Sequence, residues 1–201
     1  MKRTILLVIA VLIVTSSPTF ALVTTQSWDF SNATWNGTDS VWEADASTYQ
    51  NSNGTPTAVI KLSEGGSYVQ TPDSFWFTNV DWVELWIPNY KNDNIKKIIE
   101  LWANYSPQGS LGDISIQDTS GQDLVFYELE RSDASITYAK YAVYPNPSYE
   151  VIYLDFDSPT GAANTLYSIS VATDCIPAPG AVLLGSIGVG FIGWLRRRKT
   201  M

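Results

Sequence analysis

The chain has 201 residues, of which 45% are hydrophobic and 13% aromatic, so it can build a sizeable core and is not globally disordered. It contains no histidine and one cysteine, which excludes a Ser-His-Asp triad, a His-ligated metal site, an intrachain disulfide and a zinc site of clustered cysteines. The net charge of −8 argues against a nucleic-acid partner.

The N-terminus carries the three parts of a secretory signal peptide. Lys2 and Arg3 form a basic start, ten apolar residues follow at positions 5–14, and Thr19 and Ala21 are small residues at the −3 and −1 positions of a cleavage site. Ten helical residues reach about 15 Å, half the thickness of a bilayer core, so this segment is too short to span a membrane. We therefore expect residues 1–21 to be a signal peptide.

The region that follows, residues 22–174, reads as one domain of short strands. Its apolar runs are rich in Val, Ile, Tyr, Phe and Trp, and turn residues such as Asn53-Gly54 and Glu64-Gly65-Gly66 separate them. Many short strands at regular spacing predict an all-β fold, a jelly-roll-like antiparallel β-sandwich. The run 94–101 also has helical spacing, but its β-branched residues favour a strand. The predicted strands are 24–30, 57–62, 68–71, 74–77, 82–88, 96–105, 112–117, 124–130, 135–144, 149–156 and 166–173.

Charge divides the chain unevenly. All 20 acidic residues but only six of the 12 basic ones lie in the region 22–174, which therefore has a net charge of −14. Such a surface repels nucleic acid and acidic polymers unless cations bridge them. Five aspartates lie in or beside turns, where they are either solvated or ligands for Ca²⁺, the one cofactor that the sequence leaves open. They are Asp113, Asp118, Asp123, Asp155 and Asp157.

Nothing in the domain indicates a catalytic centre. The sequence has no Gly-x-Ser-x-Gly motif and no phosphate-binding glycine loop. Paired carboxylates of the kind that glycosidases use are abundant, but alternation along a strand places two carboxylates on one solvated face by default. We therefore expect no enzymatic activity and assign no catalytic residue. The carboxylate pairs are Asp81 with Glu84, Glu128 with Glu130, and Asp155 with Asp157.

Tryptophan is the other distinctive residue, with seven of the eight in the region 22–174. Most of these rings should lie in the core, because large rings contribute the most buried area. Trp82 and Trp86 alternate with Val83, Leu85 and Ile87 and share a strand face with Glu84. They are our candidates for a half-exposed platform on which a sugar ring could stack, with extracellular polysaccharide as the partner.

The C-terminal segment 175–201 combines an extended motif, an apolar run and a basic end. Pro177 and Pro179 keep the motif extended, and residues 180–195 form a Gly-rich apolar stretch with the length of a short transmembrane helix. Four adjacent cations hold the end of the chain in the cytoplasm and stop its transfer across the membrane. The motif is Ile176, Pro177, Ala178, Pro179 and Gly180, and the basic stop is Arg196, Arg197, Arg198 and Lys199.

Taken together, these C-terminal features resemble the bacterial PEP-CTERM sorting signal, in its Ile-Pro-Ala-Pro-Gly-Ala variant. The resemblance covers residues 176–199 and differs from the common form in having Ala178 where that form has glutamate. It implies recognition by an exosortase, a membrane cysteine protease and transpeptidase, with removal of the tail and transfer to the cell surface or an exopolysaccharide matrix. Membrane anchoring through the C-terminal helix precedes that processing.

Cys175 stands directly before the motif. It is either a small residue that ends the last strand, a partner in an intermolecular disulfide, or a thiol modified after processing. The sequence thus predicts an exported, non-catalytic surface or matrix protein. The alternatives are a calcium-dependent carbohydrate-binding module and, less favoured, a glycan-active hydrolase.

Overall fold

The structure is a computed structural model that describes residues 23–37, 40–71, 75–89, 95–119, 124–134, 136–156 and 164–177. The predicted signal peptide, the sorting motif from Ala178 onward, the apolar helix and the basic stop lie outside the described residues. Across the part that is described, no helix has the length and apolar character needed to traverse a bilayer. Residues Leu22–Ile176 form one compact unit.

The described residues form twelve β-strands and no helix, which confirms the all-β prediction. Every pairing for which the register is given is antiparallel. The strands are β1 (Val23–Trp28), β2 (Thr34–Trp35), β3 (Val41–Asp45), β4 (Thr48–Gln50), β5 (Thr57–Gln70), β6 (Phe75–Pro88), β7 (Ile95–Ser106), β8 (Ile114–Gln117), β9 (Val125–Asp133), β10 (Thr137–Tyr144), β11 (Tyr149–Asp155) and β12 (Thr165–Pro177).

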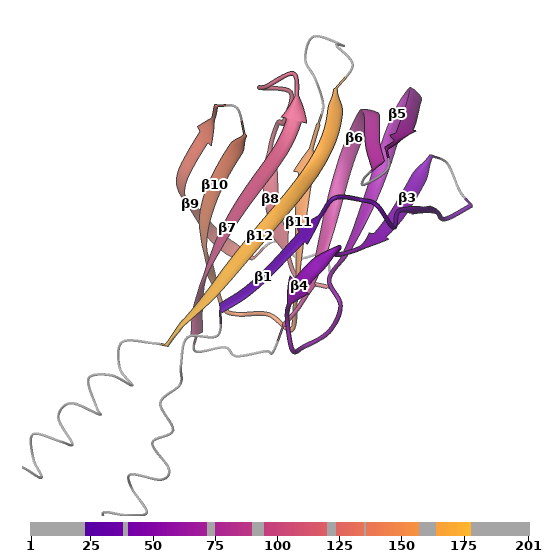
Figure 1. Ribbon diagram of the computed structural model, residues 1–201. Coiled ribbons are helices and arrows are strands. Elements are labelled where there is room, and N and C mark those ends of the chain that lie inside the picture. Colours follow the sequence, from indigo (N-terminus) through magenta and orange to yellow (C-terminus); the bar gives the residue numbers. More distant parts are fainter. Residues whose placement is uncertain are drawn as a thin grey trace, which may run out of the picture. The chain divides into compact units, whose positions relative to one another are not determined.

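The strands build two layers, which we call the first and the second sheet (Figure 1). The first sheet has the order β2-β3-β5-β6-β11-β8, and the second has the order β4-β1-β12-β7-β10-β9. The two sheets join at one corner, where Phe77 and Thr78 of β6 pair with Leu166 and Thr165 of β12. The first and last strands of the domain, β1 and β12, are neighbours in the second sheet.

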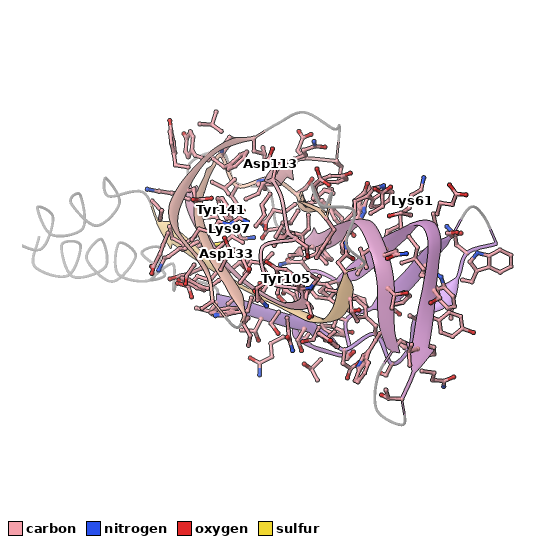
Figure 2. All side chains as sticks on the ribbon, turned by 90° about the horizontal axis from the view of Figure 1, so that it is seen from above. Lys61, Lys97, Tyr105, Asp113, Asp133 and Tyr141 are labelled. Carbon is pink, nitrogen blue, oxygen red and sulfur yellow. The ribbon has the colours of Figure 1, made fainter. Side chains whose placement is uncertain are left out.

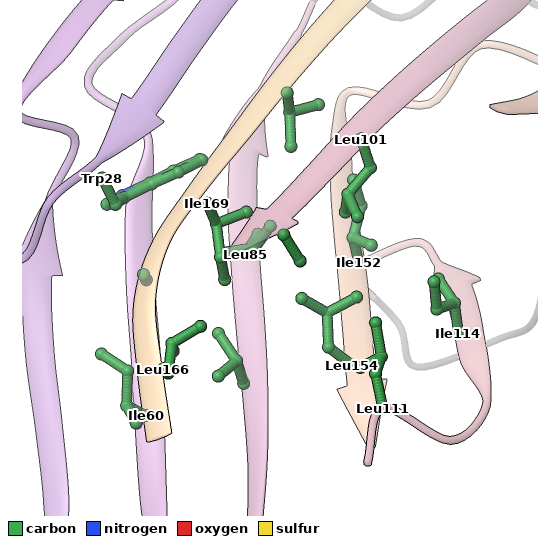
Figure 3. Packing of buried hydrophobic residues seen from close by; sticks show 14 of the residues in the cluster. Trp28, Ile60, Leu85, Leu101, Leu111, Ile114, Ile152, Leu154, Leu166 and Ile169 are labelled. Carbon is green, nitrogen blue, oxygen red and sulfur yellow. The ribbon is translucent and has the colours of Figure 1, made fainter. Parts of the chain in front are cut away.

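One core fills the space between the two sheets. Apolar side chains at alternate positions of β5, β6, β8 and β11 meet those of β1, β7, β10 and β12, so the architecture is a β-sandwich (Figure 3). The predicted alternation in β6 is confirmed, because Val83, Leu85 and Ile87 are fully buried. Trp82 and Trp86, on the opposite face of that strand, are half-buried.

Two predicted breaks between strands, one in residues 57–71 and one in residues 74–88, are wrong, because each pair of predicted strands is one continuous strand. Glycines at positions 65 and 66 were expected to form a turn between two strands, but β5 continues through them with a shift in register between Leu62 and Ser67. Gly65 has a φ of +76°, a conformation that glycine adopts without steric cost. The glycines therefore bend one long strand, and β6 opposite them is also a single strand where two were predicted.

The strands β2, β3 and β4 were not predicted from the sequence. They have two, five and three residues, and their side chains are mostly exposed, so no burial period marks them. The spacing in the run 94–101 fits a helix or a strand, and the structure places residues 95–101 in β7, a strand, as the β-branched residues indicate. The last strand extends beyond its predicted end at residue 173 to Pro177 and so includes Cys175.

Candidate functional site

Trp82 and Trp86 lie on the outer face of the first sheet. The ring centroid of Trp82 is 5.8 Å from that of Tyr153 on β11, and the two planes are inclined by 31°. Trp86 Nε1 donates a hydrogen bond of 3.1 Å to Glu84 Oε2. These contacts place the rings in one half-buried row that also contains a carboxylate.

A second aromatic group forms a hollow of about 570 Å³ at the edge of the first sheet. We call it the aromatic hollow. Its lining consists of three aromatic residues, two serines, a leucine and a glycine, contributed by β2, the start of β3 and β5. These residues are Trp35, Trp42, Tyr68, Ser40, Ser67, Leu62 and Gly66.

Strand register explains why these rings gather. Trp35 on β2 is directly opposite Trp42 on β3, and Trp42 is directly opposite Ile60 on β5. Residues directly opposite each other in an antiparallel pair point to the same side of the sheet. Ile60 is fully buried, Trp42 is half-buried and Trp35 is 60% exposed. The inner face of the sheet therefore passes from core to solvent across β5, β3 and β2.

The base of the aromatic hollow is fixed by the core. The Trp42 ring lies 5.6 Å from the ring of the fully buried Phe77, in an edge-on arrangement, and 4.5 Å from that of Tyr68. Such aromatic pairs are worth about 0.5–1.5 kcal/mol beyond their buried area. Tyr68 is 48% exposed and also packs against Phe75. The hollow thus presents a rigid ring at its base and two exposed rings beside it.

The outer face of the second sheet carries a shallow groove in two parts, of about 440 and 340 Å³, that share Ala172 of β12. Trp102 lines the first part and lies 5.5 Å from Tyr138, with the rings inclined by 41°. Lys140 and Glu100, which form an ion pair of 2.6 Å, line the second part. Trp102 and Tyr49 are the aromatic residues that line this groove.

Cys175 lies near the end of β12 and is 3% exposed. Burial raises the pKa of its thiol, and the nearby Lys97 ammonium opposes that rise. The thiolate, which is the reactive form, is therefore disfavoured while the strand is in place. Of the predicted sorting motif, Ile176 and Pro177 belong to β12, and the other members lie outside the described residues.

Among the described residues, no three His, Cys, Asp or Glu side chains gather in a way that could hold a metal ion. Asp113 and Asp155 are brought together, but the contact is between backbones: the Asp155 N–H donates to the Asp113 carbonyl at 3.1 Å. Asp118 also lies in the described part, whereas Asp123 and Asp157 do not. Calcium binding by these residues stays a prediction.

Comparison with known proteins gives a structural likeness but no family. No family model matches the chain. No curated protein matches it either. Among solved structures, the chain is similar to a β-1,3-glucan binding CBM6 from Bacillus halodurans, at 11% sequence identity and a TM-score of 0.29, over 67% of this chain and 87% of that one.

Proposed function

We propose that the chain is an exported, non-catalytic protein of the bacterial cell surface or extracellular matrix, and that its β-sandwich binds polysaccharide through the aromatic hollow. The observation that carries the binding proposal is the exposure of Trp35, at 60%, beside a ring fixed by the core. Exposed apolar side chains that gather into one patch, as Trp35 and Tyr68 do in this hollow, are a recurring mark of a binding surface. Flat aromatic faces suit the apolar faces of sugar rings, while Ser40 and Ser67 supply hydroxyls.

The charge of the domain narrows the class of polysaccharide. The region 22–174 carries 20 acidic and six basic residues. It repels acidic polymers at low salt, because their charges have the same sign. The ligand we propose is therefore a neutral glycan. A calcium-dependent mode, in which the cation bridges protein and glycan, is the alternative that removal of divalent cations tests.

In this proposal the sandwich is a jelly roll. The order β1-β12-β7-β10 in the second sheet and the order β6-β11-β8 in the first interleave strands that are distant in the sequence. Successive connections from β6 to β9, and again from β10 to β12, pass from one sheet to the other. That pattern of crossings is typical of the two Greek keys of a jelly roll.

Delivery to the surface rests on the two ends of the chain. The basic, apolar and small-residue parts of positions 1–21 support export, and the PEP-CTERM-like segment supports sorting by an exosortase. The absence of histidine and of nucleophile motifs supports a role without catalysis. A matrix protein that binds neutral polysaccharide is consistent with both the predicted export and sorting signals and the aromatic hollow.

A glycan array probed with the purified protein tests the binding proposal. We expect binding to neutral glycans, and we expect Trp35→Ala to weaken it about tenfold or more, since about 1.4 kcal/mol corresponds to a factor of ten. Because Trp35 is exposed, its removal should leave the fold intact. Trp76→Ala is the matched control, since Trp76 is 38% exposed and lies outside the hollow lining.

Two further arms separate the alternatives. Trp82→Ala tests the platform on the outer face of the first sheet, and a loss there with none for Trp35→Ala would place the site on that face instead. Loss of binding in EDTA would favour the calcium-dependent module. Absence of binding to every glycan on the array would contradict the proposal as a whole.

A further inference from the structure

A buried polar cluster lies between the two sheets. Lys97 of β7 is 1% exposed and forms an ion pair with Glu150 of β11, which is 0% exposed. Figure 2 shows Lys97 between the strands of the sandwich. Asn89, which directly follows β6, and Asn146, which lies between β10 and β11, complete the cluster.

One carboxylate oxygen organises the cluster. Glu150 Oε1 accepts a hydrogen bond from Lys97 Nζ and a second one, of 2.8 Å, from Asn89 Nδ2. The amine of Lys97 and the amide of Asn89 are therefore no more than two hydrogen-bond lengths apart. Asn89 Nδ2 also donates to Asn146 Oδ1, which fixes the orientation of the Asn89 amide.

If its role were only structural, burying this ion pair would cost desolvation free energy with little gain in stability. A buried ion pair regains its desolvation cost only when further hydrogen bonds satisfy both partners, and such pairs often contribute nothing to stability. Here Glu150 Oε2 is buried without a hydrogen-bond partner among the described residues. A carboxyl group with one oxygen bound to an amine and an amide, and the other free, has the geometry of a general base and acid.

We propose that Lys97 and Asn89 become joined by an intramolecular isopeptide bond, with Glu150 as the catalytic proton carrier. Glu150 takes a proton from the Lys97 ammonium, and the neutral Nζ then attacks Asn89 Cγ. The Nζ–Cγ bond forms and the Cγ–Nδ2 bond breaks. Of the three Nζ protons, one stays on the new amide and two leave with Nδ2 as ammonium. Glu150 passes these protons on and ends ionised, as it began, so no oxidant or other co-reactant is needed.

The fold supplies what this reaction requires. The shared carboxylate holds the nucleophile and the amide in one place, which lowers the entropy cost of their reaction. Asn89 is only half-buried, so the released ammonia has a route to solvent. The bond would connect β7 of the second sheet to the end of β6 in the first. It would thus cross-link the two sheets covalently, which would stabilise a protein that functions outside the cell.

Mass spectrometry of the full chain tests the proposal directly. We expect the denatured protein to weigh less than its sequence predicts by one ammonia. Proteolysis should release one branched peptide in which residue 97 is joined to residue 89, with no tryptic cleavage after residue 97. Lys97→Arg and Glu150→Gln should both restore the full mass, because the first lacks the nucleophilic amine and the second lacks the base.

Lys140→Arg is the matched control, since Lys140 also pairs with a glutamate, at 2.6 Å, but in a half-exposed position. It should retain the loss of ammonia. A wild-type mass equal to that of the sequence, a branch that ends on Asn146, loss of water in place of ammonia, or loss of ammonia that persists in Lys97→Arg would each overturn the proposal. The wild-type measurement alone decides the matter if a variant fails to fold.

Discussion

At the scale of single residues, Asp29 shows how a small hydrogen-bond network ties a turn together. Its carboxylate accepts hydrogen bonds from Ser47 Oγ and, at 2.9 Å, from the Ser31 N–H. Burial raises the pKa of Asp29, but the hydrogen bonds from Ser47 and Ser31 together lower it by more than burial raises it. The pKa of Asp29 therefore lies below the ordinary 3.8. The folded state therefore prefers the ionised carboxylate. This stability is present above the unfolded pKa and is lost as the pH falls through the folded one.

Replacing Ser47 by alanine tests that network. We expect the pKa of Asp29 to rise and the free energy of unfolding at neutral pH to fall by about 1 kcal/mol or less, a value kept small because the site is partly solvated. The difference from the parent should shrink as the pH falls below the ordinary 3.8 and through the lower pKa that Asp29 has in the folded state. Urea denaturation at several pH values, with NMR titration of the carboxyl, measures both effects.

Ser63→Ala is the control for this experiment. Ser63 Oγ donates to the Asn79 carbonyl at 3.2 Å, so it makes a hydrogen bond of similar kind with no carboxylate. Its loss should change stability equally at all pH values. A Ser47→Ala effect that is independent of pH would contradict the proposed role of the Asp29 charge.

At the scale of elements, the irregular part of β5 depends on a glycine that has no room for a side chain. A Cβ atom on Gly66 would meet the Leu62 Cβ at 2.6 Å and the Ser63 carbonyl oxygen at 2.9 Å. Leu62 is 5% exposed and belongs to the core, so it cannot move freely. We expect Gly66→Ala to lower the free energy of unfolding by about 1–3 kcal/mol, the usual cost of overpacking. Chemical denaturation measures it.

Gly109→Ala is the control that separates the cost of steric overlap from the cost of an unfavourable backbone conformation. Gly109 has a φ of +85° and nothing within 4 Å of an added Cβ, so its replacement costs about 1 kcal/mol through backbone conformation alone. Gly66→Ala should also reduce sugar binding, since Gly66 lines the aromatic hollow. Equal stability of the parent and Gly66→Ala would show that β5 can move at this point.

The central strands were predictable because each has one face in the core. In β11, Ile152 and Leu154 are buried while Tyr153 between them is half-buried, and a period of two in the sequence reports that difference. The edge strand β4 has no buried residue, so its pairing with β1 leaves no trace in the sequence pattern. The composition and the apolar period predicted the strands that contribute side chains to the core. They could not predict a strand such as β4, whose side chains are all exposed.

The candidate site was less predictable than the fold. Trp82 and Trp86 could be placed on one outer face from alternation alone. The aromatic hollow depends on the register between β2, β3 and β5, which brings Trp35 next to Trp42. The one local signal was a tryptophan directly before the turn residues Asn36-Gly37, where a ring is rarely buried. The Lys97–Glu150 pair gave no signal, since its partners are 53 residues apart.

At the scale of the whole molecule, β12 closes the domain and leads into the predicted sorting segment. It pairs with β1 from Ile169 to Asp174 and contacts β6 and β7 as well. Its inward side chains Leu166, Ile169 and Val171 are buried in the shared core. The strand is therefore needed for folding, whereas the residues after Pro177 are predicted to serve only delivery. Two truncations separate these roles.

A chain that ends at residue 177 should fold with the same urea midpoint as the parent and, after export, leave the membrane fraction. A chain that ends at residue 164 should not fold, because loss of β12 removes one of the two neighbours of both β1 and β7 and opens the core. Denaturation and membrane fractionation of both chains are the measurements. If the chain ending at 177 stays with the membrane, the predicted helix at 180–195 is not the anchor. If that chain fails to fold, residues after Pro177 belong to the domain, since the strand that completes the sandwich is still present.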